Sequence, residues 1–460
     1  MQLNADVNAS PALNPAPASP PTSMLTSTST STSTLRLSLG TAVAALLAPV
    51  ALAAPGAPGD PGARVPWQVD SAVLLYAESG GRVKALEPVI AVRRTDADEH
   101  TLSLKLTVDT LTGASPNGAV AQPGAQTFTS PSGESSYTTP AGSMPLDTSF
   151  KDTRGALSAG YERPLDRLTR LSFGGNFSSE YDFTSVGANV AIARDLEGRN
   201  TTLSLGLALE GNQIRPVGGT PVGLSVASAG GTRLGSGSRN VADVLLGVTQ
   251  VMNRRWLMQV NLGLGRGSGE HSDPYKILSV VDGSTGLLAG DRYVHERRPD
   301  SRSRVSLYWG HKIHLARDVL DLSWRGYRDD WGVRAHTLDA RWRVNLGGGS
   351  YLEPRWRHHR QGAADFWRGW LVEGQDWDST GHRSTLAAAS ADPRLARFTG
   401  NTLGLTWGQP LSWGGELTLR GEVYRQVQAR PADAPGVLQT LPIAPGLTAT
   451  MLTAGYRYNW

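Results

Sequence analysis

Apolar and polar side chains alternate strictly over long stretches of this sequence. In residues 101–109, TLSLKLTVD, one face carries Leu102, Leu104, Leu106 and Val108, and the other carries Ser103, Lys105, Thr107 and Asp109. Successive side chains of a β-strand point to opposite faces, so a period of two predicts strands with one apolar face. The pattern returns at 256–265, 304–315 and 333–346, and no segment after the first 54 residues sustains helical spacing.

The alternation predicts sixteen strands, most of them about 9 to 13 residues long. A tilted strand needs ~9–11 residues to cross a bilayer. The predicted strands are 70–78, 83–94, 101–109, 153–163, 168–179, 182–194, 201–210, 241–251, 256–265, 304–315, 319–328, 333–346, 350–360, 395–407, 416–427 and 448–460.

The lengths of the connections alternate as well. Every even connection is short, namely 95–100, 164–167, 195–200, 252–255, 316–318, 347–349 and 408–415. The odd ones include all the long loops, at 110–152, 211–240, 266–303, 361–394 and 428–447, and three tight turns at 79–82, 180–181 and 329–332. Short periplasmic turns and long extracellular loops are typical of outer-membrane barrels, whereas a soluble sandwich has no reason to separate them.

Strands that have one apolar face and no helix to cover it must form a closed sheet. In lipid, only closed barrels and helices satisfy all their backbone hydrogen bonds. The sequence therefore predicts an all-β fold, a transmembrane antiparallel β-barrel of about sixteen strands. A barrel of that size encloses a lumen wide enough for water.

The first residues predict an exported chain. Residues 1–34 are rich in Pro and Ala and then repeat Ser and Thr, and an apolar segment at 35–54 ends in Ala51-Leu52-Ala53. This arrangement predicts a leader and signal peptide over 1–53, with Met24 as an alternative translation start and a membrane anchor as the alternative role. A Pro/Gly-rich spacer at 54–69 and a barrel at 70–460 follow.

Aromatic side chains are expected to form a ring beside the short turns. They lie on the apolar face at Tyr161, Trp256, Trp342, Trp407, Tyr456, Tyr458 and Trp460. Such rings belong at the membrane interface, where the ring body meets hydrocarbon and its polar edge meets water; ordinary core packing is the alternative. The alternating last strand, with Tyr456, Tyr458 and the terminal Trp460, resembles the assembly signal that the barrel-assembly machinery reads.

Composition excludes several other classes. The chain has no Cys, which excludes disulfide scaffolds, thiol catalysis and a lipid-modified Cys anchor. Its mean hydropathy of −0.26 is too low for a bundle of transmembrane helices. The formal charge is +4, but the basic residues are dispersed, so no nucleic-acid partner is expected.

Seven phrases of the sequence resemble a family of Gram-negative outer-membrane proteins known as a domain of unknown function. These phrases are SGGRVKALEP (79–88), DTLTGASPNGA (109–119), RLSFGGNFSSEYDF (170–183), DPYKILSVVD (273–282), ERRPDSR (296–302), DDWG (329–332) and AADF (363–366). The resemblance implies an outer-membrane barrel and carries over no activity, cofactor or site residue. Genes of such proteins often lie near a flavin-transferring enzyme and a thioredoxin-like protein, which hints at redox partners.

Charged side chains gather on the inward face of the strands from 304 to 360. The predicted lumen wall consists of Arg304, Lys312, Asp321, Arg325, Asp339, Arg341, Arg343, Glu353, Arg355 and Arg357. An arginine-rich wall in a water-filled pore concentrates anions. The alternative is a ladder of Arg–carboxylate pairs that braces neighbouring strands, and both can hold together.

The segment 273–282 has apolar side chains that suit neither water nor a mobile loop. We expect a constriction or plug inside the lumen, and the alternative is an additional hairpin above the membrane. The residues concerned are Asp273, Tyr275, Lys276, Ile277, Leu278, Val280 and Val281.

Other patterns give no site. His358 and His359 are adjacent on a strand, so they point to opposite faces and cannot share a metal ion. GLGRGSG at 263–269 lacks the following helix that a nucleotide-binding motif needs. The acidic pairs Asp329-Asp330 and Glu180/Asp182 lie at tight turns, where Asp commonly forms the turn itself.

The sequence thus predicts a porin-like channel or conduit for small solutes, with anionic solutes as one option, in the outer membrane of a Gram-negative bacterium. The alternative is a barrel that serves as scaffold or sheath for periplasmic and surface redox partners, and a barrel hydrolase comes third. We expect no enzyme activity, no cofactor and no metal. Expected partners are outer-membrane lipid and the barrel-assembly machinery.

Overall fold

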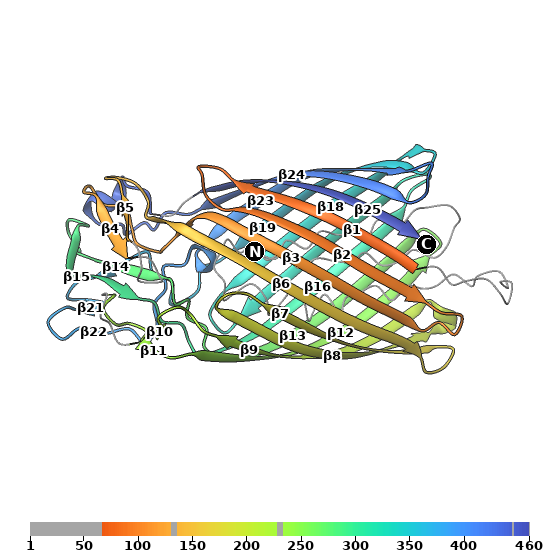
Figure 1. Cartoon of the computed structure of the whole chain (residues 1–460), viewed down its shortest axis with the longest axis horizontal. Helices are drawn as coiled ribbons and strands as arrows, with labels where there is room; N and C mark the ends of the chain where they lie inside the picture. Colours follow the sequence, from red (N-terminus) through yellow and green to blue (C-terminus); the bar gives the residue numbers. More distant parts are fainter. Residues whose placement is uncertain (1–66, 130–135, 228–232, 444–445, 460) are drawn as a thin grey trace.

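The computed structural model describes residues 67–129, 136–227, 233–443 and 446–459. Sixteen strands form one closed antiparallel barrel in which each strand pairs with its neighbour in the chain, and the last strand pairs with the first (Figure 1). The predicted fold class is confirmed. Among the described residues, none belongs to a helix long and apolar enough to span a bilayer.

All sixteen predicted strands are present. They are β1 (Trp67–Glu78), β2 (Lys84–Thr95), β3 (Thr101–Pro116), β6 (Leu146–Pro164), β7 (Thr169–Ser179), β8 (Phe183–Leu196), β9 (Thr201–Ile214), β12 (Gly237–Asn253), β13 (Trp256–Gly269), β16 (Ser301–His314), β17 (Val319–Asp329), β18 (Arg334–Gly347), β19 (Ser350–Gln361), β23 (Phe398–Pro410), β24 (Glu416–Gln428) and β25 (Leu447–Asn459).

Several strands are longer than predicted, and most of the extra length lies on the side of the long loops. β3 ends at Pro116 rather than at 109, and β6 begins at Leu146 rather than at 153. The outward residues of the extension of β3, Thr110 and Thr112, are polar. Where the outer face no longer contacts hydrocarbon, the ladder of backbone hydrogen bonds continues but the apolar alternation stops. At the other end, β1 begins at Trp67, within the predicted spacer; the predicted leader lies outside the described residues.

The outer face of the barrel is apolar. On β3, the side chains of Leu102, Leu104, Leu106 and Val108 are 38–48% exposed, and the same alternate exposure of large apolar side chains recurs around the barrel. A soluble monomer rarely exposes a contiguous apolar surface of this extent. The apolar belt is therefore the lipid-facing surface of a transmembrane barrel.

Aromatic residues near the short turns bind polar groups at their edges. The indole N–H of Trp342 donates to the Asp318 carboxylate at 3.2 Å, and that of Trp256 donates to His311 Nδ1 at 3.1 Å. Tyr456 donates its hydroxyl proton to the Gly414 carbonyl and stacks on Tyr458. This is the geometry of interfacial aromatic side chains. Trp460 lies outside the described residues.

Small elements occupy the connections. Most lie beyond the strand ends on the long-loop side, the loop rim, opposite the turn rim (Figure 1). They are β4 (Gln126–Thr129) with β5 (Ser136–Thr139), β10 (Thr220–Pro221) with β11 (Arg233–Leu234), β14 (Ile277–Val281) with β15 (Leu288–His295) and β20 (Leu371–Val372), β21 (Trp377–Asp378) with β22 (Arg383–Ser384), and the 3-10 helices η2 (Pro393–Leu395) and η3 (Gly436–Gln439); η1 (Glu197–Arg199) lies at the turn rim.

Candidate functional site: a charged lumen wall beneath a cap

Ion pairs connect the inward faces of β18, β19 and β24. The Asp339 carboxylate binds the guanidiniums of Arg341 at 3.2 Å and Arg355 at 2.6 Å. Arg355 also reaches Glu422 on β24 at 3.1 Å. Arg357 lies directly opposite Asp339 in the β18–β19 ladder. One carboxylate thus lies among three arginines, and these ion pairs connect neighbouring strands.

The other predicted wall residues also lie on the inward face. Arg343 binds Glu353 at 2.9 Å, and the Lys312 ammonium lies 3.9 Å from the Asp321 carboxylate. The guanidinium of Arg325 lies over the ring of Tyr308, 5.5 Å from its centroid.

Arg304 stands apart from this group, because its partner belongs to β12. Its guanidinium binds Asp243 at 2.7 Å across Gly265 of the intervening strand. A side chain at Gly265 would overlap both partners.

Part of the wall remains accessible although it faces inward. The side chains of Lys312, Arg341 and Arg343 are 23%, 20% and 28% exposed, against 9% for Arg355. The described side chains therefore leave these three cations partly accessible from the interior. An accessible charged surface can attract ions as well as brace the strands.

The sequence reasoning missed several inward charges. Arg420 donates to Thr406 at 3.2 Å, Arg154 binds Asp109 on the opposite wall, and Arg457 binds Asp70 at 2.6 Å across the β1–β25 seam. These three pairs are directly opposite in their ladders, so the register of neighbouring strands would have revealed them. For partners two strands apart, the signal is a glycine in the intervening strand. Gly404 lies between Arg355 and Glu422 just as Gly265 lies between Arg304 and Asp243.

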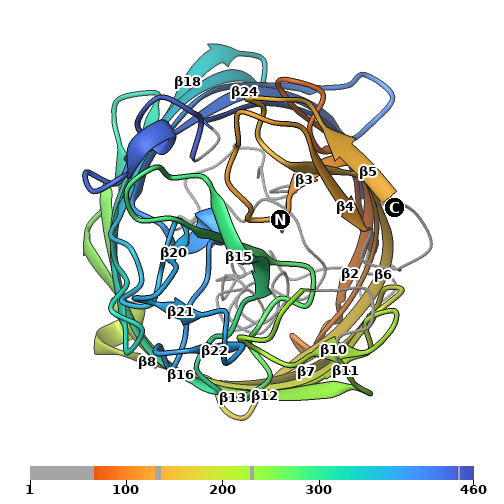
Figure 2. The ribbon, with the colours of Figure 1, turned by 90° about the vertical axis from the view of Figure 1, so that its left-hand side faces the viewer.

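The five long connections pack together over the loop rim, and we call their described residues the cap (117–145, 215–236, 270–300, 362–397 and 429–446). Viewed from that end, β15 and β20 lie across the barrel opening (Figure 2). Two apolar clusters form its centre, with members from all five connections: Leu278, Val280, Val294, Leu371, Trp377 and Ala389 with Leu224 and Val226 against them, and Val120, Val281, Trp370, Ala434 and Leu438.

The segment expected to constrict the lumen is the middle of this cap. Residues Ile277–Val281 form β14, which pairs with β15 on one side and β20 on the other, beyond the ends of the barrel strands (Figure 1). Ser279 accepts a hydrogen bond from the Val120 amide, and Lys276 donates to the Pro116 carbonyl. The placement corresponds to the hairpin alternative rather than to a loop folded along the lumen wall, because the apolar side chains find their burial against other loops.

Buried charges fasten two loops of the cap to each other. Arg298 binds Glu296 and Asp392 at 2.7 Å each, and Arg394 binds Asp392 and Asp273. All five side chains are at most 7% exposed. Burial alone would raise the pKa of Asp392, but the guanidiniums of Arg394 and Arg298 hold it well below its usual range. Asp273 is thus an ion-pair partner inside the cap, while Tyr275 donates its hydroxyl proton to Asp182 at the rim.

Two buried histidines of the cap predict a dependence of its stability on pH. Burial lowers the pKa of both His271 and His295 to about 4. An opened cap would protonate them near pH 6.5 while the closed cap keeps them neutral, so the free energy of opening falls as the pH decreases from about 6.5 towards 4. Between pH 7.5 and 5.5 we expect a loss of about 1 kcal/mol for each histidine.

Pulse proteolysis in urea at the two pH values measures this loss. The His271→Gln, His295→Gln double variant serves as the reference, because the other titrating groups of the cap are common to both proteins. An equal change in the wild type and the double variant would contradict the assignment.

Asp329 of the acidic pair Asp329-Asp330 acts as a turn residue, whereas Asp182 of the other pair accepts a hydrogen bond from Tyr275 of the cap. Asp329 accepts hydrogen bonds from Arg302 and Tyr327 and from the amides of Trp331 and Val333. Gly332 closes this turn at a φ of +83°. GLGRGSG at 263–269 lies within β13 throughout. His358 contacts Asn401 and His359 contacts Thr337, so the adjacent histidines have separate partners.

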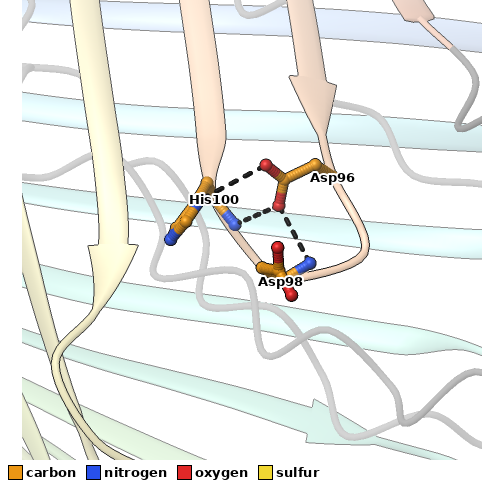
Figure 3. Close-up of side chains that lie close together, drawn as sticks. All are labelled: Asp96, Asp98 and His100. Carbon is orange, nitrogen blue, oxygen red and sulfur yellow. Dashed lines mark hydrogen bonds and ion pairs between the residues drawn. The ribbon is translucent and has the colours of Figure 1, made fainter.

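A group that sequence reasoning did not single out lies at the turn rim. Asp96, Asp98 and His100 gather in the β2–β3 turn (Figure 3). The Asp96 carboxylate already accepts hydrogen bonds from the amides of Asp98 at 3.0 Å and His100 at 2.8 Å. These bonds explain the cluster as a turn motif.

Comparisons with solved structures give outer-membrane proteins at low similarity. CdiB from Acinetobacter baumannii is 10% identical with a TM-score of 0.42, over 85% of this chain and 60% of CdiB, so this chain spans under two thirds of that protein. OccK2 (OpdF) of Pseudomonas aeruginosa in complex with glucuronate is 11% identical with a TM-score of 0.37, over 86% and 98% of the two chains. OccD3 (OpdP) of the same organism is 9% identical with a TM-score of 0.39, over 86% and 91%.

A search of curated proteins gives no match. A family model described as "Protein of unknown function (DUF3570)" matches residues 36–458, nearly the whole chain, which confirms the resemblance carried by the loop phrases. The chain belongs to the DUF3570 family.

Proposed function

We propose that this protein is an outer-membrane channel of a Gram-negative bacterium that passes small anionic solutes. The turn rim would face the periplasm and the loop rim the outside, as in other barrels of this kind. The cap would then lie over the outer mouth and limit entry.

The surplus of cations on the lumen wall is the observation that carries this proposal. Between β16 and β24 the inward cations are Arg302, Arg304, Lys312, Arg325, Arg341, Arg343, Arg355, Arg357 and Arg420, and the inward carboxylates are Asp321, Asp329, Asp339, Glu353, Glu416 and Glu422. Rings and rows of arginine favour anions in a water-filled pore. Among the described residues, Arg325 and Arg420 form no ion pair with a carboxylate, so their charges remain available to a solute.

Ion selectivity tests the proposal. In planar bilayers with a salt gradient, the wild type should prefer chloride over potassium. The Arg325→Gln, Arg420→Gln double variant should lower the permeability ratio by about two- to threefold, because it removes two lumen charges without breaking an ion pair. The outward-facing Arg360→Gln, Arg425→Gln double variant should leave the ratio unchanged. A cation-selective wild type, or the same ratio in all three proteins, would overturn the proposal.

The cap favours a second function. Loops that lie across the opening suit a barrel that holds partners rather than passing solutes, such as a scaffold or sheath for periplasmic and surface redox proteins. If the refolded barrel shows no conductance in the bilayer, and still shows none after its cap has been opened, the result would support the scaffold function and contradict the channel function.

A further inference from the structure

A groove of about 650 Å³ lies on the outer surface of the barrel near the loop rim. Its floor is apolar and belongs to the lipid-facing positions of β12, β13 and β16, namely Ala242, Val244, Leu264 and Val305. Arg266, Arg328 and Arg334 line its upper part, and all three are exposed. Cations thus stand above an apolar surface.

Among the described residues, the guanidiniums of these three arginines have no hydrogen-bond or ion-pair partner. Arg328 and Arg334 are directly opposite in the β17–β18 ladder, an arrangement that destabilises a sheet when the charges are alike. Two acids also line the groove: Asp330 accepts a hydrogen bond from the Ser303 amide at 2.9 Å, and Asp329 forms an ion pair with Arg302. This contrasts with the lumen wall, where most arginines bind carboxylates. An external anion would relieve the repulsion.

The height of the groove matches the membrane interface. Arg266 lies ten residues after the interfacial Trp256 on β13. Ten residues rise about 33 Å along a strand, or about 23 Å along the axis of a barrel whose strands tilt by ~45°. The apolar band of such barrels is ~25 Å tall. Arg266 therefore stands at the level of the opposite headgroups.

The positions of the arginines suit two phosphates rather than one. Arg266 pairs with Ser303 of β16, and Arg328 pairs with Val305 of the same strand, so the two arginines flank β16 from either side. Two strand spacings and an offset of two residues along the strands separate their Cα atoms by about 12 Å. Arginine is the side chain best suited to bind phosphate oxygens in pairs.

We propose that this groove binds a bisphosphorylated glycolipid, the lipid A part of lipopolysaccharide. Arg266 would bind one phosphate and the Arg328–Arg334 pair the other, while acyl chains lie on the apolar floor. The inference rests on the proposed orientation of the loop rim towards the outer leaflet but not on the passage of solutes.

Lipid binding to the refolded, detergent-solubilised full barrel tests it. Native mass spectrometry would titrate bisphosphorylated lipid A, its dephosphorylated form and phosphatidylglycerol. The Arg266→Gln, Arg328→Gln, Arg334→Gln variant should bind bisphosphorylated lipid A at least about tenfold more weakly than the wild type. Dephosphorylated lipid A should bind the wild type about as weakly.

A matched control removes three outward cations of the same rim outside the groove, with Lys84→Gln, Lys151→Gln and Arg425→Gln. It should retain wild-type affinity within about twofold. Heat-modifiable migration shows whether the triple variant folds. If it does not fold, the single Arg328→Gln variant is used in its place. Equal binding by groove variant and wild type, equal loss in the control, or phosphatidylglycerol binding as tightly as lipid A would each overturn the inference. Bilayer conductance of the same variants separates this result from the fate of the channel proposal.

Discussion

Replacing Arg298 with Met should open the cap. The side chain of Arg298 is fully buried between Glu296 and Asp392, which are equally buried. Removing one partner of a buried ion pair leaves an uncompensated charge and typically costs about 3–5 kcal/mol. The open fraction of the cap should therefore rise more than about a hundredfold. Hydrogen exchange of amides in 270–300 and 362–397 measures this rise.

The exposed pair between Arg383 and Asp378 provides the matched control. Their side chains are 78% and 38% exposed, so Arg383→Met should change exchange by less than about 0.5 kcal/mol. Heat-modifiable migration should show an intact barrel in both variants, because the ladder of the sixteen strands does not include these residues. Similar exchange in the two variants would show that the buried pairs do not hold the cap.

Removing the hairpin at the centre of the cap should increase conductance. Replacing 276–296 with a short Gly-Ser linker removes β14 and β15, and Figure 2 shows β15 lying across the opening. The ends to be joined are adjacent, since the Glu296 amide donates to the Lys276 carbonyl at 3.2 Å. If the cap limits entry, single-channel conductance should rise several-fold, because the narrowest section of a pore dominates its resistance.

A Gly-Ser replacement of the 96–100 turn is the control for this deletion, because it alters the opposite rim. It should conduct as the wild type does. Unchanged conductance after removal of the hairpin would mean that the cap does not restrict the pore. If neither protein shows any conductance, the result would instead favour the scaffold function.

The barrel could be predicted because its signal is local. Alternation in residues such as 101–109 identifies a strand without knowledge of its partner. The lengths of the connections indicate at which rim of the barrel each connection lies. The exact ends could not be predicted. Beyond the hydrocarbon, as at Thr110 and Thr112, the outward face no longer has to be apolar, so the period disappears while the pairing goes on.

Partners across the wall depended on information that one strand does not contain. Arg355 was placed on the lumen wall from its own strand, but its contact with Glu422 required the register of two further ladders and the glycine between them. The same holds for Arg304 and Asp243.

The cap shows the same limit for loops. The apolar side chains of Ile277–Val281 indicated that the segment must be buried. The sequence did not indicate that the loop at 362–397, which supplies β20, buries this segment.

The seam between β1 and β25 has a consequence for how this chain acquires its structure. Every other ladder of the cylinder joins strands that follow one another along the chain, so each can form as a hairpin with modest loss of chain entropy. The seam joins Asp70 to Arg457, residues 387 positions apart. Contacts of such sequence separation form late and slowly. The seam is therefore expected to close last, and until it closes the sheet presents two unpaired edges, one on β1 and one on β25.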